Sequence, residues 1–175
     1  MKRIVYTRHD GGVSICCPAR EIMGFLSHGG FFANPVRGVI DRHVEAEIRA
    51  GRPEWLAHRY VKALAFGGCT TSGAFEIIRD RDCVPHGTGF EVWRFDDLPQ
   101  DRWFRNAWQR SHNGGPIAID MAKARKIQMK RLQSAATQRK AELQVARWRE
   151  RIRRAETPEQ LKNIWPKGLV HAAAI

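Results

Sequence analysis

Apolar and polar positions alternate at the start of the chain, in two short runs at residues 3–7 and 13–17. Asp10 and Gly11 lie between these runs, and both tolerate the backbone conformations of a tight hairpin turn. The pattern therefore predicts a β-hairpin. We expect Pro18 to end its second strand, because proline cannot donate a hydrogen bond to a strand ladder.

From Ala19 the apolar residues recur at helical spacing, which predicts three helices at residues 19–30, 35–51 and 52–68. Each of these segments ends in glycine, which is typical of a helix stop. The third helix is expected to bury one apolar stripe, formed by Trp55, Leu56, Tyr60, Val61 and Leu64.

The segment after residue 68 has the composition of strands. Residues 74–81 and 89–95 predict two strands, and residues 116–120 predict a last short one. Between them, residues 98–108 predict one helical turn or a short helix. Together these elements indicate an α+β globular domain at residues 1–121, with a small mixed sheet and helices.

A long basic helix is predicted next, at residues 122–155, as a C-terminal helical extension. Its second half has a heptad-like seam that needs a partner, formed by Ala141, Val145, Trp148, Ile152 and Ala155. In the first half the same register reaches polar residues, which predicts a break or bend near residues 133–138. Residues 156–175 predict a short helix, capped by Thr157, and a tail.

The composition is that of a folded protein. Hydrophobic residues make up 43% of the chain and include six Trp, which argues against disorder. No apolar run approaches the roughly 20 residues that span a bilayer, and the start MKRIVYTRHDGG lacks the apolar core of a signal peptide. We therefore expect a soluble intracellular protein with no membrane partner and with free thiols.

Nearly all of the net charge of +12 lies in the predicted basic helix, where twelve Lys or Arg stand against two Glu. Arginine suits phosphate, and the charge favours acidic partners of either kind, protein or nucleic acid. The candidate partner-binding residues are Val145, Trp148, Ile152, Arg147, Arg149 and Arg151. The candidate phosphate contacts are Lys126, Lys130, Arg131, Arg139, Lys140, Arg153 and Arg154.

Residues that often carry catalysis or bind metal form no complete motif here. Cys83 and His86 have the spacing of a zinc knuckle, but a second spaced pair is missing. Cys69, His58 and Asp41 are residue types of cysteine hydrolases, without a recognisable sequence context. We therefore expect no catalytic residues, no metal and no cofactor, and a protein that is not an enzyme.

The aromatic stretch DRWFRNAW, residues 101–108, has two interpretations. Trp103, Phe104 and Trp108, with Arg102 and Arg105 between them, could stack on a single nucleic-acid strand. Aromatic residues at this spacing more often fill a core, and we favour that interpretation.

Four stretches of the chain resemble a group of uncharacterised phage and prophage proteins of alphaproteobacteria, encoded near virion and tail genes. These stretches are IVYTRHDGGVSICCPA, LPQDRWFRNAW, GPIAIDMAKARKIQMKRL and TPEQLKNIWP. The resemblance implies a phage-encoded accessory protein that acts near tail or virion assembly. It implies no particular activity.

The leading hypothesis is a non-enzymatic phage protein that docks on other virion, tail or assembly proteins through its basic C-terminal helices. The alternative is a protein that binds DNA or RNA with the helix at residues 122–155. A small hydrolase or metalloprotein ranks third. We expect the protein in the host cytoplasm during assembly or in the virion, and an oligomer is compatible with the sequence.

Overall fold

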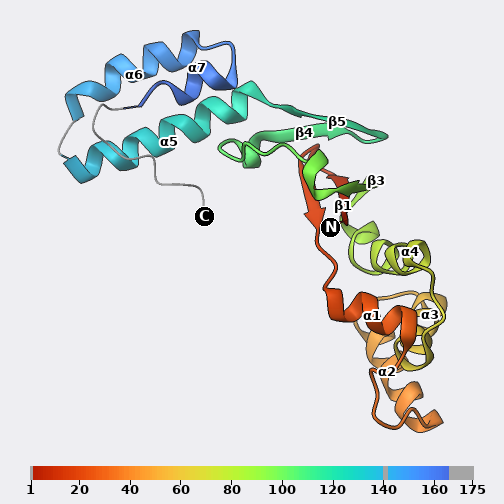
Figure 1. Ribbon diagram of the computed structural model, residues 1–175. Helices are drawn as coiled ribbons and strands as arrows, with labels where there is room; N and C mark the ends of the chain where they lie inside the picture. The colour runs from red at the N-terminus through yellow and green to blue at the C-terminus, as the bar shows by residue number, and fades with distance from the viewer. Residues whose placement is uncertain (1, 140–141, 166–175) are drawn as a thin grey trace.

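The computed structural model describes residues 2–139 and 142–165, and it describes side-chain surroundings outside residues 136–146. The fold is α+β, as predicted. In Figure 1 the molecule is elongated, with the helices of residues 20–82 at one end and the C-terminal helices at the other. The strands lie between these two groups of helices and join them.

The strands form two small sheets. In the first sheet β1 (Lys2–Arg8) lies between β2 (Val13–Cys16) and β3 (Gly87–Arg94), and both pairings are antiparallel. The second sheet is an antiparallel pair of β4 (Trp108–Ser111) and β5 (Gly114–Ile119). The N-terminal hairpin and the strands near residues 89–95 and 116–120 are confirmed. The expected mixed sheet is wrong, because all pairings among the described strands are antiparallel.

Four helices follow the hairpin: α1 (Arg20–His28), α2 (Arg37–Arg49), α3 (Glu54–Phe66) and α4 (Thr71–Asp82). The first three are confirmed, but the strand predicted at residues 74–81 is wrong, since this segment lies in α4. The Thr70 hydroxyl caps α4 by accepting a hydrogen bond from the Gly73 N–H at 3.1 Å. The segment then buries Ala74, Phe75, Ile77 and Ile78, a spacing that fits one face of a helix.

Helices α1 and α3 end against each other at two glycines. Gly29 and Gly67 have φ angles of +76° and +72°, and a Cβ on Gly67 would lie 2.5 Å from the His28 carbonyl carbon. This close approach lets the two chain segments exchange backbone hydrogen bonds, from Gly30 N to Ala65 O and from Gly68 N to Ser27 O. Glycine is therefore required sterically at this crossing.

The core of this helical end contains α1–α4 and one face of the three-stranded sheet. Of the stripe predicted on α3, Leu56, Tyr60, Val61 and Leu64 are buried, whereas Trp55 is 58% exposed. The prediction for Trp55 is therefore wrong. A smaller cluster of Val5, Val13, Leu98 and Trp108 packs the two sheets together.

The C-terminal part folds into α5 (Met121–Arg139), α6 (Glu142–Arg154) and α7 (Pro158–Lys162). The Arg125 guanidinium donates a 2.8 Å hydrogen bond to the Ala155 carbonyl, so the start of α5 lies beside the end of α6. The two helices are therefore antiparallel, and residues 122–155 do not form one long extension. Helix α5 also continues through residues 133–138, where a break was expected. Thr157 caps α7 as predicted.

Candidate nucleic-acid interface and arginine cleft

The apolar seam predicted on the basic helix is buried inside the chain. Trp148 and Ile152 are 6% and 4% exposed, and they pack with Leu132 of α5 and Leu161 of α7. Their partner is thus the neighbouring helices, so these two side chains do not lie on a surface open to docking. Val145 lies in α6, but its side chain is outside the described surroundings.

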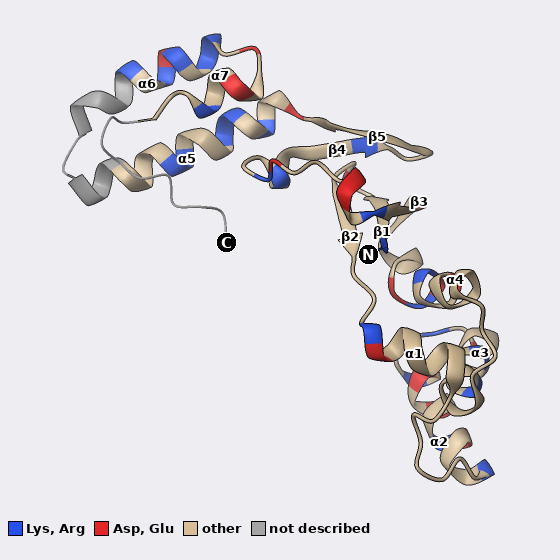
Figure 2. Cartoon of the chain, viewed as in Figure 1, with Lys and Arg blue, Asp and Glu red and all other residues tan. Residues whose placement is uncertain are grey.

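The arginines of α6 lie on the outer side of the helical pair. Arg147, Arg149 and Arg151 are exposed and form no ion pair with the residues that the structure describes. Arg153 and Arg154 are also exposed and share Glu150, at 3.1 and 2.8 Å. Figure 2 shows this basic stretch along α6, interrupted by one acidic position. The predicted partner-binding arginines therefore remain available.

The candidate phosphate contacts of α5 divide into two groups. Lys126 and Lys130 are exposed, whereas Arg131 is partly buried and turns toward a cleft. Arg139 belongs to α5, but its side chain is outside the described surroundings, and Lys140 is outside the described residues. The cations of α5 therefore do not all lie on one surface: Lys126 and Lys130 face solvent, and Arg131 lies at the cleft.

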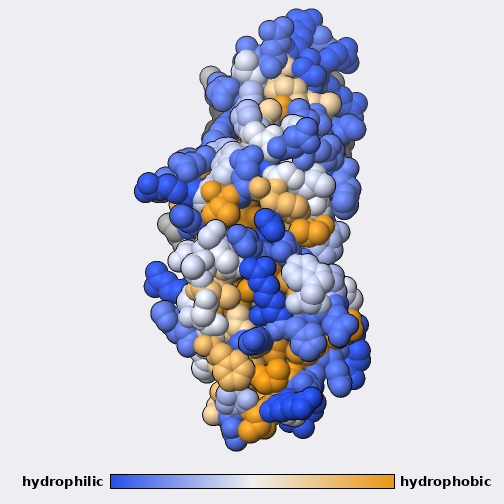
Figure 3. Space-filling view, turned by 90° about the vertical axis from the view of Figure 1, so that its right-hand side faces the viewer, coloured by the Kyte–Doolittle hydropathy of each residue, from blue (hydrophilic) through white to orange (hydrophobic). Residues whose placement is uncertain are grey.

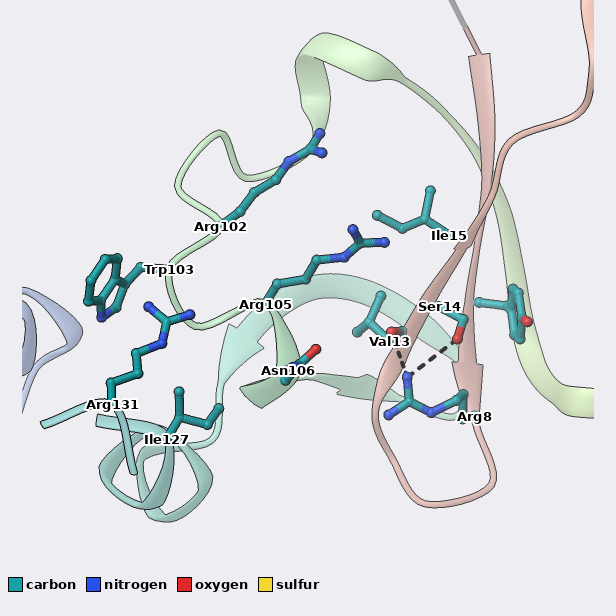
Figure 4. Close-up of a pocket in the computed structure, with 11 residues that line it drawn as sticks. Arg8, Val13, Ser14, Ile15, Arg102, Trp103, Arg105, Asn106, Ile127 and Arg131 are labelled. Atoms are coloured by element: carbon teal, nitrogen blue, oxygen red, sulfur yellow. Dashed lines mark hydrogen bonds between the residues drawn. The ribbon is translucent and has the colours of Figure 1, made fainter. Parts of the chain in front are cut away.

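The arginine cleft has a volume of about 490 Å³ and lies between the N-terminal hairpin, the loop before β4 and helix α5. Its wall is formed by Tyr6, Arg8, Val13, Ser14, Ile15, Arg102, Trp103, Arg105, Asn106, Ile127 and Arg131. Four of these residues are arginines and none is acidic. Figure 4 shows Arg105 reaching across the cavity toward β2, and Arg131 beside Trp103.

The four arginines of the cleft differ in their partners. Arg8 is held at 2.9 Å from the Val13 carbonyl and at 3.2 Å from the Asp10 carboxylate. Arg131 lies over the Trp103 ring at 4.1 Å, and burial lowers the pKa of its guanidinium. Within the described part of the chain Arg102, Arg105 and Arg131 form no ion pair. Three cations therefore lie at one cavity without a protein carboxylate to neutralise them.

The aromatic wall of the cleft is fixed by a chain of hydrogen bonds. The Trp103 indole N–H donates to the Gln128 side-chain oxygen at 2.9 Å, and the Gln128 amide donates to the Ile164 carbonyl at 2.9 Å. Gln128 is fully buried, and Trp165 packs edge-on against Trp103. Lys162 pairs with Asp101 beside this wall. The cleft is therefore held in place by α5 and α7 together.

The side chains of residues 101–108 divide between the core and the arginine cleft. Phe104 and Trp108 are 1% and 2% exposed, which confirms the core interpretation for these two rings. Arg102, Trp103 and Arg105 instead line the cleft. The places of Arg8 and Arg131 in the same cleft were not predicted, because long-range packing brings them there.

The stretches that carry the phage resemblance meet at this cleft. IVYTRHDGGVSICCPA supplies Arg8, LPQDRWFRNAW supplies Arg105, and GPIAIDMAKARKIQMKRL supplies Arg131. The fourth stretch, TPEQLKNIWP, supplies Trp165 behind the aromatic wall.

The thiols and imidazoles do not converge in the described structure. Cys83 is buried, and a hydrogen bond with Cys16 together with burial raises the pKa of its thiol. Across residues 2–139 and 142–165, no three His, Cys, Asp or Glu side chains lie where they could hold a metal ion together. No described helix has the length and apolar character needed to cross a membrane.

Comparisons of the chain with protein-family models, curated proteins and solved structures found no match. The resemblance to phage proteins therefore stays a prediction.

Proposed function

We propose that the protein binds nucleic acid through its basic C-terminal helices, as a non-enzymatic accessory protein of a phage particle or of its assembly. One observation supports this proposal most strongly: the seam residues Trp148 and Ile152 are buried while the arginines of α6 remain exposed. The seam was the reason to favour a protein partner for this helix. Because α5 and α7 cover the seam, the side chains of α6 that a partner can contact are mainly its exposed arginines.

The chemistry of α6 suits a phosphate backbone. Arginine presents a planar fork of N–H donors that matches phosphate oxygens, and it stays charged at all physiological pH values. Arg147, Arg149 and Arg151 have no carboxylate partner in the described structure that would compete with phosphate. Contacts of this kind carry no sequence information, so we expect binding that depends on salt and not on base sequence.

The test is fluorescence anisotropy with labelled duplex and single-stranded DNA over a series of salt concentrations. Replacing Arg147, Arg149 and Arg151 by Ala should weaken binding and reduce the slope of log K against log salt by up to about 0.9 for each phosphate that is no longer neutralised. The matched control replaces Arg37, Arg42 and Arg49 of α2, which removes the same charge from the other end of the molecule. Equal losses in both variants, or affinity that ignores salt, would refute the proposal.

Protein docking remains a second candidate, at a different place from the one the sequence suggested. Large apolar side chains are exposed at the helical end that α1–α4 form, where Trp55, Phe66 and Val36 are 58%, 59% and 52% exposed. Figure 3 shows hydrophobic patches in the lower part of the face that it presents and further patches near the middle of that face. Exposed apolar patches often mark sites of protein interaction.

This second candidate can be tested with purified phage particles or assembly intermediates. If the helical end docks on another phage protein, Trp55→Ser and Phe66→Ser should reduce co-sedimentation with the particle, while the α6 triple variant should not. Retention of both apolar variants, with loss of the α6 variant, would leave nucleic-acid binding as the function.

A further inference from the structure

We infer that the arginine cleft is a binding site for a nucleotide unit, with the phosphate among the guanidinium groups and the base against the apolar part of the wall. The inference goes beyond the proposed function, because α6 contributes none of the residues that line the cleft. It therefore predicts a second and separate site on the same molecule.

Three cations without a carboxylate partner among the described residues line the cleft, and one of them, Arg102, also lies over the Phe95 ring at 5.3 Å. Arg102, Arg105 and Arg131 come from two separate segments and line one cavity, and the described residues give none of them a carboxylate. Arg131 is partly shielded from water, so bulk solvent compensates its charge less well than at an exposed site. A bound anion would supply the missing negative charge.

The number of cations favours phosphate over carboxylate. A carboxylate offers two oxygens, which one guanidinium fork can satisfy. A terminal phosphate offers three oxygens and a charge of about −1.5 to −2 at neutral pH, so it can accept hydrogen bonds from several arginines that approach from different directions. Arg8, on the hairpin side of the cleft, adds a fourth guanidinium, although Asp10 already offsets part of its charge.

The rest of the wall includes three aliphatic side chains that a base could contact, beside the polar Ser14 and Asn106. Val13 and Ile15 lie on the hairpin side, and Ile127 lies on the α5 side. A volume of about 490 Å³ falls within the range of roughly 300 to 1,000 Å³ that is usual for sites of small organic ligands. A phosphate alone would leave much of this space, and all of its apolar wall, without contacts.

Part of the wall is held by contacts within the protein. Gln128 is fully buried and holds the Trp103 indole, while the Arg131 guanidinium lies on that ring at 4.1 Å. Two of the wall residues are thus fixed by contacts that do not involve the ligand. Prior ordering of this kind lowers the entropy cost of binding.

The experiment is isothermal titration calorimetry of the full chain at low salt, with four probes: inorganic triphosphate, adenosine triphosphate, a short single-stranded oligonucleotide and an acidic peptide. We expect adenosine triphosphate to bind more tightly than inorganic triphosphate, because only the former has a base for the apolar wall. Comparison of adenosine triphosphate with the oligonucleotide then shows whether the natural source is a free nucleotide or a strand. The inference is supported if adenosine triphosphate or the oligonucleotide binds more tightly than inorganic triphosphate.

Three single substitutions distinguish binding at the arginine cleft from binding that depends on positive charge elsewhere on the molecule. Arg105→Gln should weaken adenosine triphosphate binding by about tenfold or more, since it removes charge-assisted hydrogen bonds. Arg49→Gln on α2 is the matched control, and Arg151→Gln on α6 should affect duplex DNA but not adenosine triphosphate. Because Arg105 is exposed and no described side chain pairs with it, its replacement should leave the fold intact, which circular dichroism can verify.

Several results would overturn the inference. They are no binding of adenosine triphosphate by the wild type, equal losses in Arg105→Gln and Arg49→Gln, equal affinity for inorganic triphosphate, or equal affinity for the acidic peptide. A different result would refute the proposed function, namely that Arg151→Gln leaves the affinity for duplex DNA unchanged. The two conclusions can therefore fail separately.

Discussion

In the helical end formed by α1–α4, several arginines lie beside carboxylates. Arg81 contacts both oxygens of Glu47, at 3.0 and 3.1 Å, and Arg59 lies 3.4 Å from Glu76. Outside this end, Arg147 of α6 and Arg105 in the loop before β4 have no such partner among the described residues. The apolar side chains show the reverse arrangement, with Trp55 exposed at the first end and Trp148 buried at the second.

This difference shows what each end leaves for a partner. Where carboxylates neutralise several of the arginines, apolar side chains such as Trp55 are exposed, and contact with another protein is the interaction that would bury them. Where apolar side chains such as Trp148 fill an internal core, exposed arginines such as Arg147 have no carboxylate partner among the described residues, and an anion is the partner that would pair with them. Which arginines have a carboxylate partner, and where they lie, is therefore more informative about function than the net charge of +12.

The largest effect is expected when Trp148 and Trp55 are each replaced by alanine, in two separate variants. Trp148→Ala should lower the free energy of unfolding by about 3 to 5 kcal/mol, because it opens a cavity between α5, α6 and α7. Trp55→Ala should change the free energy by no more than about 0.5 kcal/mol, since the side chain is 58% exposed. Urea unfolding followed by circular dichroism measures both. Similar losses in the two variants would contradict the assignment of one ring to the core and the other to the surface.

A second test concerns the crossing of α1 and α3. Gly67→Ala should cost roughly 2 to 4 kcal/mol, because it combines an unfavourable positive φ with a clash against the His28 backbone. Gly68→Ala is the matched control: its φ is also positive, at +90°, but a Cβ there meets nothing within 4 Å. The difference between their unfolding free energies isolates the steric part. If the two variants are equally stable, close packing does not explain the glycine at residue 67.

Local pattern predicted much of the fold. The N-terminal hairpin, α1–α3, β3, β5 and the cap of α7 follow from short-range signals that their own residues contain. Helix α4 was missed because its β-branched pair Ile77 and Ile78 resembles a strand, and because Thr70, which caps the helix in the structure, was not recognised as a cap. The short strand β4 was missed because Gln109, Arg110 and Ser111 are three consecutive polar residues, which lack the apolar and polar alternation of a strand.

The pairing of α5 with α6 could not be predicted in the same way. A seam on α6 requires an apolar partner, but its period does not say whether that partner is another chain or the preceding helix. The matching face of α5 contains Gln128, which makes the apolar stripe look interrupted. Gln128 is satisfied by Trp103 and by Ile164, which are 25 and 36 residues away in sequence. The cleft depends on the same long-range contacts, so its residues could be named but not brought together.

A third test compares arginines at the two ends. Arg81→Met should lower the free energy of unfolding by about 1 to 2 kcal/mol, since it breaks a bidentate and partly shielded contact with Glu47. Arg154→Met should cost no more than about 0.5 kcal/mol, because this arginine is 79% exposed and pairs with Glu150 on the same helix. Thermal unfolding at two salt concentrations measures both effects. A larger loss in Arg154→Met would mean that the α6 arginines serve stability and are not free for a partner.

The smallest expected effect lies at the junction of the two ends, where Glu91 of β3 joins β5. Its carboxylate accepts hydrogen bonds from the Gly115 N–H at 2.9 Å and from the Trp93 indole at 2.6 Å, and these bonds lower the pKa of Glu91 below its ordinary value of 4.5. A carboxyl whose pKa is lower in the folded protein contributes stability above the ordinary value. That contribution is lost as the pH falls through the folded pKa.

Glu91→Gln should therefore reduce the loss of stability below about pH 4.5, by less than about 1 kcal/mol because the Glu91 side chain is 38% exposed. Chemical unfolding at pH 6 and at lower pH measures this difference, and Glu54→Gln, with a side chain that is 76% exposed, is the control. If Glu91 couples the two ends of the molecule, unfolding of Glu91→Gln near neutral pH should occur in two steps. The transition followed by tryptophan fluorescence should then differ from the transition followed by far-UV circular dichroism, because the sheet and the C-terminal helices would separate before each of them unfolds. Coincident transitions in that variant would show that the junction depends on the cluster around Trp108 and not on this carboxylate.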